Sequence, residues 1–118
     1  MGLDILIVDG DHGDLLTFLL QTAGYPARHE VDVEKAWMEL LQAPVALVVT
    51  GYMMPAMDGC QLVSLMRATK ALEKTPVLMM TVLREEDVRE KCEFDAFLRR
   101  PFTAEALINQ VRIILGPF

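Results

Sequence analysis

The chain has 118 residues, 53% of them hydrophobic and 24% charged, a composition typical of a single folded domain covering residues 1–118. Its formal net charge of −6 argues against a nucleic-acid-binding surface, because phosphate contacts require a clustered basic patch. No apolar run is long enough to cross a membrane and the first residues lack a signal-peptide pattern, so we expect a cytoplasmic protein that contacts no membrane.

Short apolar runs typical of strands alternate with helical patterns along the chain. Strands are predicted at 3–8, 27–31, 45–49, 76–80 and 95–98. Apolar residues at helical spacing predict helices at 15–23, 33–41, 59–69 and from about Ala104, the last with Thr103 as its N-cap. Alternating strands and helices favour an α/β fold with a parallel sheet that helices cover on both faces.

The remaining helical pattern, REEDVREKC at 84–92, differs from the others. Its apolar stripe consists of Val88 and Cys92 alone. Two acid–base pairs stand at i, i+4 spacing: Glu85 with Arg89, and Asp87 with Lys91. With so little to bury, this segment is expected to be a loosely held surface helix or to complete its burial against a partner.

The two cysteines, Cys60 and Cys92, show neither the C-x-x-C spacing of redox motifs nor an accompanying histidine pattern. We therefore predict a buried or half-buried thiol at each position. A redox role or a metal site is not indicated.

Polar residues and glycines follow the predicted strands, where a parallel sheet collects its functional groups. The segments just past the strand ends are DGDHG (9–13), TGYMMP (50–55), TVL (81–83) and RRP (99–101). We therefore expect one rim of the sheet to carry Asp9, Gly10, Asp11, Gly51, Thr81 and Arg100.

The same segments resemble the receiver domain of response regulators in two-component signalling. ILIVDGD, VVTGYMMPAMDG, TPVLMMTVL and FLRRPF are similar to its loops, in order, over almost the whole chain. The resemblance implies a flavodoxin-like (βα)5 fold, a doubly wound five-stranded parallel sheet of order 2-1-3-4-5. It also implies phosphoryl transfer from a histidine-kinase phosphohistidine onto an aspartate.

The acidic positions of the family match this chain only in part. Of the acidic pair after the first strand, the first residue falls on Asp9 and the second on Gly10. The phosphoacceptor aspartate falls on Gly51. A glycine at a strand end can simply serve a sharp turn, but changes that coincide at one rim favour a loss of chemistry.

The remaining functional positions of the family are better preserved. Its hydroxyl residue falls on Thr81, and its aromatic switch residue falls on Phe97. Its lysine falls on Arg100, with Pro101 in the place of a cis-proline.

These changes predict a degenerate phosphorylation pocket. Gly51 removes the nucleophile together with a Mg²⁺ ligand, and Gly10 removes a further ligand. Because Asp9 alone is a poor Mg²⁺ site, we expect no metal and no cofactor. We expect Arg100 to bind Asp9 bidentately and to replace the metal site.

The sequence therefore predicts a pseudo-receiver, not an enzyme, that acts through protein–protein contacts. Its partner would be a histidine kinase, another receiver or an output domain. The interaction face implied by the family falls on Val88, Arg89, Cys92, Phe97 and Arg99.

Two other functions are open at this point. An active receiver could use Asp9 or Asp11 as its phosphoacceptor. A flavin- or nucleotide-binding protein on the same sheet would need a Gly- or Ser/Thr-rich phosphate cradle, whereas DGDHGDLL places aspartates there, which would repel an anion.

Overall fold

The computed structural model describes residues 4–54 and 56–117, so residue 3 of the first predicted strand and Pro55 of TGYMMP lie outside the described residues. Within these ranges, strands and helices alternate along the chain. The strands are β1 (Ile5–Val8), β2 (Ala27–Glu30), β3 (Leu47–Gly51), β4 (Val77–Thr81) and β5 (Ala96–Arg99). The helices are α1 (Gly13–Thr22), α2 (Val33–Gln42), α3 (Gly59–Arg67), α4 (Glu85–Arg89) and α5 (Ala104–Leu115).

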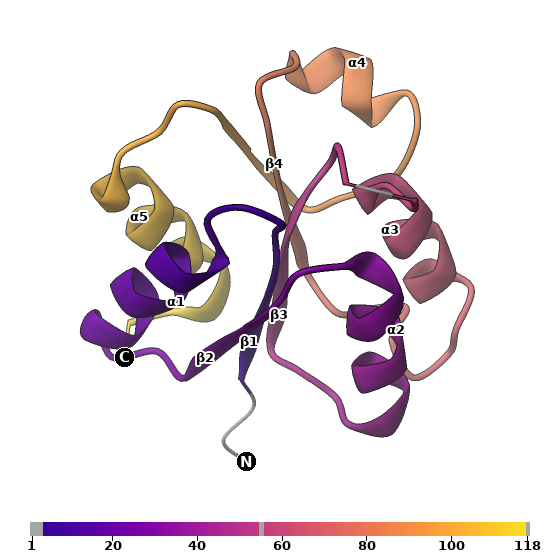
Figure 1. The fold of residues 1–118 in the computed structure, drawn as a ribbon, viewed down its shortest axis with the longest axis horizontal. Coiled ribbons are helices and arrows are strands. Elements are labelled where there is room, and N and C mark those ends of the chain that lie inside the picture. Colours follow the sequence, from indigo (N-terminus) through magenta and orange to yellow (C-terminus); the bar gives the residue numbers. More distant parts are fainter. Residues whose placement is uncertain (1–3, 55, 118) are drawn as a thin grey trace.

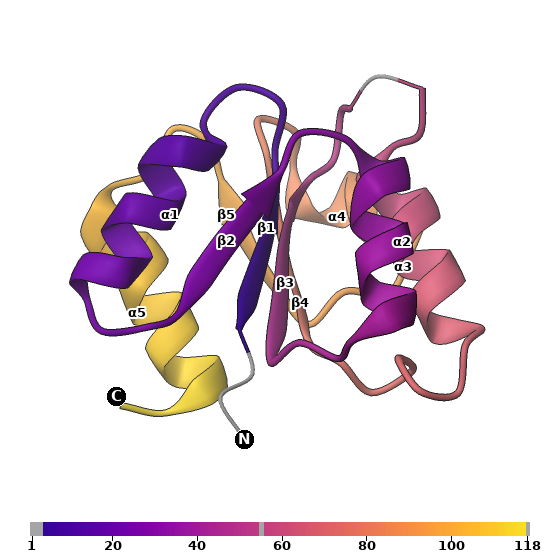
Figure 2. The same cartoon turned by 60° about the horizontal axis from the view of Figure 1, so that its bottom comes forward.

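The five strands form one parallel sheet in the order β2-β1-β3-β4-β5. Helices α1 and α5 cover one face of this sheet, and α2 and α3 cover the other (Figures 1 and 2). Helix α4 lies on the α3 side, within the connection between β4 and β5. The flavodoxin-like α/β fold predicted from the sequence is thereby confirmed.

The three central strands β1, β3 and β4 are buried on both faces of the sheet, and this explains why they are largely apolar, whereas the edge strand β2 carries polar side chains. Successive residues of β1 point to opposite faces: Leu6 and Val8 join the core under α2 and α3, while Ile5 and Ile7 join the core under α1 and α5. No helix in the described part of the chain combines the length and apolar character needed to span a membrane.

Three strands extend further toward their carboxyl ends than predicted. The structure ends β3 at Gly51, β4 at Thr81 and β5 at Arg99, whereas the apolar runs stop earlier. The reason is that the ladder depends on backbone hydrogen bonds, which do not require an apolar side chain. Gly51 pairs with Met80 and Thr81 with Arg99, so these residues are held by the sheet itself.

Side-chain caps fix the start of α3 and of α5. At α3, Asp58 Oδ1 accepts from the Gln61 backbone N at 2.8 Å, and Gln61 Oε1 accepts from the Asp58 backbone N at 2.7 Å. At α5, Thr103 Oγ1 accepts from the Ala106 backbone N at 3.0 Å, as predicted. Helix α3 ends at Arg67, two residues before the predicted 69.

Gly59, the first residue of α3, lies directly against the end of β3. A Cβ atom at this position would collide with the carbonyl oxygen of Gly51. Position 59 therefore requires a glycine, since only a residue without Cβ allows this close approach of two backbones.

Helix α4 is shorter than the predicted 84–92 and ends at Arg89. The predicted pair between Arg89 Nε and Glu85 Oε2 is present at 2.7 Å. The predicted pairing of Asp87 with Lys91 is wrong, because the helix ends before Lys91 can lie one turn above Asp87. Asp87 instead pairs with Arg84, at 3.2 Å between Oδ2 and Nε.

The prediction of two unpaired thiols is also wrong, because Cys60 and Cys92 form a disulfide with their Cα atoms 5.4 Å apart. Cys60 is the second residue of α3, and Cys92 follows α4. The two residues are 32 positions apart, and no spacing rule connects them. The two cysteines meet because the chain, after leaving β4 and forming α4, turns back toward the start of α3.

Candidate functional site

A small cavity of about 150 Å³ lies at the carboxyl edge of the sheet. Among the residues predicted for this rim, the structure brings five together around it: Asp9, Asp11, Gly51, Thr81 and Arg100. They follow or end β1, β3, β4 and β5, whose carboxyl ends share one edge because the strands are parallel. Gly10 lies in the loop that follows β1, beside Asp9.

Asp9 is the buried carboxylate of this cavity, with 7% of its surface exposed. Its Oδ2 accepts a hydrogen bond from the His12 backbone N at 3.1 Å. The same oxygen lies 3.3 Å from Arg100 Nη2, and the Arg100 side chain is 24% exposed. The predicted pairing of Asp9 with Arg100 is present.

The bidentate geometry expected for this pair is wrong. Both contacts fall on Oδ2, whereas Oδ1 lies on the side of Gly51. The guanidinium of Arg100 also lies 5.7 Å from the centroid of the Phe102 ring. A single charge-assisted contact at 3.3 Å still joins the loop after β1 to the loop after β5.

Neither Gly10 nor Gly51 is required by crowding. A Cβ at position 51 would lie 3.4 Å from Met54 Sδ and 3.6 Å from Asp9 Oδ1, which are ordinary contacts. At position 10 the nearest atom would be the Val31 carbonyl oxygen, at 3.9 Å. Neither glycine has the positive φ found at Gly24 and Gly116. Backbone permissiveness at a turn therefore does not account for these two glycines.

Thr81 and Arg100 complete the rim. Thr81 is 3% exposed, and its Oγ1 accepts from the Leu83 backbone N at 3.3 Å, so the hydroxyl supports the turn after β4. The Arg100 backbone N donates to the Thr81 carbonyl oxygen at 2.8 Å. The peptide bond from Arg100 to Pro101 is cis, as the resemblance implies.

The oxygen donors at this rim do not fit Mg²⁺. The ion prefers octahedral oxygen ligands and usually binds through carboxylates. Here Asp9 is partnered by Arg100, Asp11 is exposed, and Gly10 and Gly51 supply no side-chain donor. Across residues 4–54 and 56–117, no three histidine, cysteine or acidic side chains gather closely enough to hold a metal ion.

The interaction face implied by the resemblance is only partly at the surface. Val88 has no exposed surface and Cys92 is 9% exposed within a disulfide, so these two side chains lie beneath the surface of the predicted face, which itself stays a prediction. Their apolar stripe faces the core, because burying it is the only way α4 can gain hydrophobic stabilisation. Arg89 and Arg99 are exposed, and Phe97 is half-buried.

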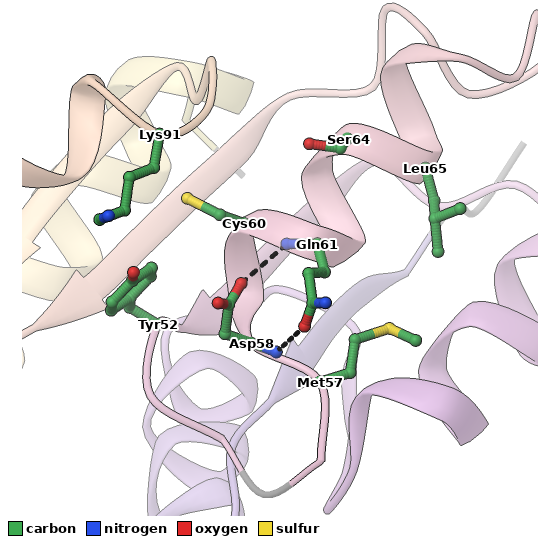
Figure 3. A pocket seen from close by; sticks show the side chains of 8 residues that line it. All are labelled: Tyr52, Met57, Asp58, Cys60, Gln61, Ser64, Leu65 and Lys91. Carbon is green, nitrogen blue, oxygen red and sulfur yellow. Dashed lines mark hydrogen bonds between the residues drawn. The ribbon is translucent and has the colours of Figure 1, made fainter.

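Three further lining residues belong to the segments TGYMMP and TVL that the sequence places at this rim, although they are not among its six expected residues. Tyr52, Met53 and Val82 line the small cavity together with the predicted residues. Tyr52 also borders a larger hollow of about 550 Å³ between α3 and the turn after α4, shown in Figure 3. No sequence pattern marks this hollow, because its walls come from segments that are distant in the chain.

The family model for the response regulator receiver domain matches residues 5–112. The match covers most of the chain and every strand and helix cited above except the end of α5. The chain belongs to the response regulator receiver domain family, and it is a receiver domain of the two-component type.

Two curated relatives illustrate the similarity. The DNA-binding dual master transcriptional regulator RpaA of Synechocystis sp. is 31% identical, covering 94% of this chain and 48% of the relative. A 14.6 kDa protein of Leptolyngbya boryana is 30% identical, covering 93% of this chain and 88% of the relative. The chain spans about half the length of the regulators that it matches first.

Solved receiver structures have the same fold. The chemotaxis protein CheY4 of Vibrio cholerae superimposes with a TM-score of 0.89 at 24% identity, covering 96% of this chain and 98% of that one. The receiver domain of a signal transduction histidine kinase from Syntrophus aciditrophicus gives a TM-score of 0.89 at 27% identity, with 97% and 90% coverage.

Proposed function

We propose that this chain is a pseudo-receiver: a receiver domain that is not phosphorylated on aspartate and that signals through protein–protein contacts. The observation that carries the proposal is Gly51, at the carboxyl end of β3. A Cβ atom at this position would make only ordinary contacts, yet the glycine there offers no nucleophile. Phosphoryl transfer to a receiver requires a carboxylate there and a cation beside it.

The remaining carboxylate is poorly suited to replace the nucleophile. Asp9 is buried, and its Oδ2 is already bound by the His12 backbone N and by Arg100. A carboxylate paired with a guanidinium is a weaker nucleophile than an unpaired one, because its negative charge is stabilised. In this proposal, Arg100 holds the loops after β1 and β5 together, so the pocket keeps one state without a metal.

A flavin- or nucleotide-binding function has less support. The rim cavity of about 150 Å³ is smaller than typical pockets for ligands of that size, which occupy roughly 300–1,000 Å³. We further propose that the domain has no catalytic activity and no resident cofactor, and that it is cytoplasmic.

The proposal is tested by restoring the missing carboxylates. The natural chain and a Gly10→Asp/Gly51→Asp variant are incubated with Mg²⁺ and acetyl phosphate, and intact masses are recorded. We expect a phosphoryl adduct on the variant, because a Cβ atom fits at both positions and the aspartates supply the nucleophile and a Mg²⁺ ligand. A Gly10→Ala/Gly51→Ala variant controls for the added Cβ atoms and should remain unmodified.

The intact mass of the natural chain decides between a pseudo-receiver and an active receiver. An adduct on its Asp9 or Asp11, located by peptide mapping, would show an active receiver and overturn the proposal. The absence of an adduct on the natural chain supports the proposal, and thermal melting verifies that all three proteins are folded.

For the protein-contact half of the proposal, the exposed residues of the face are Arg89 and Arg99. We expect Arg99→Glu to weaken binding to a cognate kinase or output domain by about tenfold, since one charge reversal at an interface rim costs on the order of 1 kcal/mol. Lys70→Glu, the same charge change on the turn after α3, is the matched control. Unchanged affinity of Arg99→Glu across a panel of such domains would contradict this face.

A further inference from the structure

The Cys60–Cys92 disulfide joins the start of α3 to the turn after α4. We call residues 82–93, which contain α4 and its flanking turns, the α4 segment. Figure 1 shows α4 at the periphery of the fold, beyond the two helix layers that cover the sheet. The bond therefore ties the most peripheral helix to a helix that packs on the sheet.

The other polar contacts of α4 do little to hold it in place. Both of its ion pairs, Arg84–Asp87 and Glu85–Arg89, stay within the α4 segment. Arg89 also donates to the Phe94 carbonyl oxygen at 3.0 Å and lies 4.2 Å from the centroid of the Phe94 ring, but Phe94 follows closely in the chain. Val88 is the one fully buried side chain of the helix. The α4 segment has one further polar link to α3, because Arg67 Nε donates to the Glu93 carbonyl oxygen at 3.3 Å. Anchoring to α3 thus rests on this hydrogen bond, on buried Val88 and on the disulfide, which is the only covalent link.

The disulfide can be approached from the surface. Cys60 lines the hollow of about 550 Å³, and in Figure 3 its side chain points from α3 toward the side where Lys91 lies. Cys92 lines another hollow, of about 440 Å³, which Lys91 also borders. With exposed fractions of 6% and 9%, Cys60 and Cys92 are largely buried, and each reaches the surface only where it lines its hollow.

Lys91 borders both hollows and so places a positively charged side chain on the walls that lead to the disulfide. Its side chain is exposed and forms no ion pair with any residue in the described ranges. A nearby ammonium group attracts an incoming thiolate and stabilises the thiolate that leaves.

We propose that Cys60–Cys92 is a thiol–disulfide exchange site, and that its reduction by a dithiol releases α4 from α3. A thiolate of the dithiol attacks one cysteine sulfur, forming a mixed disulfide and expelling the other cysteine as a thiolate. The second thiol of the reductant then attacks the mixed disulfide and expels the remaining cysteine. Two electrons and two protons pass to the cysteine pair, and the dithiol becomes a cyclic or intramolecular disulfide.

This exchange would regulate the α4 segment, which carries Arg89 of the proposed interaction face. Only that consequence for partners rests on the proposed function. The exchange and the release of α4 are measured on the isolated chain, so their failure is distinguishable from a failure of the pseudo-receiver proposal.

The experiment compares the oxidised chain with the chain reduced by dithiothreitol or by reduced thioredoxin, without denaturant. Thiols are counted by maleimide mass shift, and backbone amide exchange is followed by mass spectrometry. We expect two maleimide adducts after reduction. We expect exchange in residues 82–93 to accelerate at least about tenfold while α1 and α5 change little. The Cys60→Ser/Cys92→Ser variant should reproduce the reduced pattern.

Lys91→Gln tests the role of the charge. It should slow reduction by glutathione about threefold at low salt, and it should leave amide exchange in the oxidised chain unchanged. Lys70→Gln is the matched control and should have no effect on the rate.

Three outcomes would overturn the proposal. The purified chain could keep two thiols even after treatment with oxidised glutathione. The disulfide could be reduced only when the chain is unfolded by denaturant. Reduction could also fail to accelerate amide exchange in the α4 segment, relative to the oxidised chain, by more than it accelerates exchange in α1 and α5.

Discussion

Helix α5 has twelve residues and buries Leu107 and Val111 completely, whereas α4 has five residues and buries only Val88. The two helices precede and follow β5 in the chain, and different kinds of interaction hold them in place. Apolar surface fixes α5 on the sheet, and a covalent bond fixes the α4 segment to α3. A short helix can thus occupy a defined place without a wide apolar face. The two helices should therefore respond to different perturbations.

Removing the disulfide should give the largest loss of stability. For the Cys60→Ser/Cys92→Ser variant we expect the free energy of unfolding to fall by about 3–4 kcal/mol, because the cross-link closes a long loop in the unfolded chain. Urea unfolding without reductant measures the loss. With reductant present, the natural chain should approach the variant. If the natural chain in reductant remains much more stable than the variant, the buried serines, and not the lost bond, destabilise the variant.

Truncating α5 should cost slightly less and should not depend on redox conditions. Leu107→Ala leaves a cavity at a site with no exposed surface, so we expect a loss of about 3 kcal/mol in the free energy of unfolding. Ile113→Ala, at a side chain that is 77% exposed, is the matched control and should change stability by less than about 0.5 kcal/mol. Equal losses in the two variants would contradict apolar anchoring of α5.

Breaking an ion pair of α4 should have the smallest effect. Glu85→Gln removes the partner of Arg89, and we expect a loss of about 0.3–0.5 kcal/mol that fades at high salt. Glu73→Gln, at an acidic side chain without an ion pair in the described ranges, serves as the control. Thermal melting at low and high salt measures both. A loss well above 1 kcal/mol would show that ion pairs, and not the disulfide, fix α4.

The fold was predictable because both faces of the sheet are buried. This burial makes the central strands apolar runs such as Leu6–Val8, and it makes the intervening segments amphipathic helices. Strand ends were placed too early because Gly51 and Thr81 are held by backbone hydrogen bonds, which leave no apolar signal in the sequence.

The site was predictable as a set of neighbours but not as a geometry. Parallel topology explains why Asp9 and Arg100, 91 positions apart, meet at one rim. The single-oxygen contact was not predictable, because the orientation of the Asp9 carboxylate also depends on a hydrogen bond from the His12 backbone N, which no side-chain pattern encodes. The Cys60–Cys92 bond was missed for a related reason. It depends on where the chain returns after α4, and local spacing carries no information about that return.

The contrast between Gly59 and the two rim glycines bears on how this domain can evolve. A Cβ atom at position 59 would collide with the backbone of Gly51, so selection must preserve a glycine there for as long as the fold persists. The codons for Gly10 and Gly51 are under no such steric constraint, and a single-base transition such as GGC to GAC would introduce an aspartate at either position. Since every glycine codon becomes an aspartate or glutamate codon by one base change, a carboxylate at either position is a single mutation away, with no steric barrier to its Cβ atom.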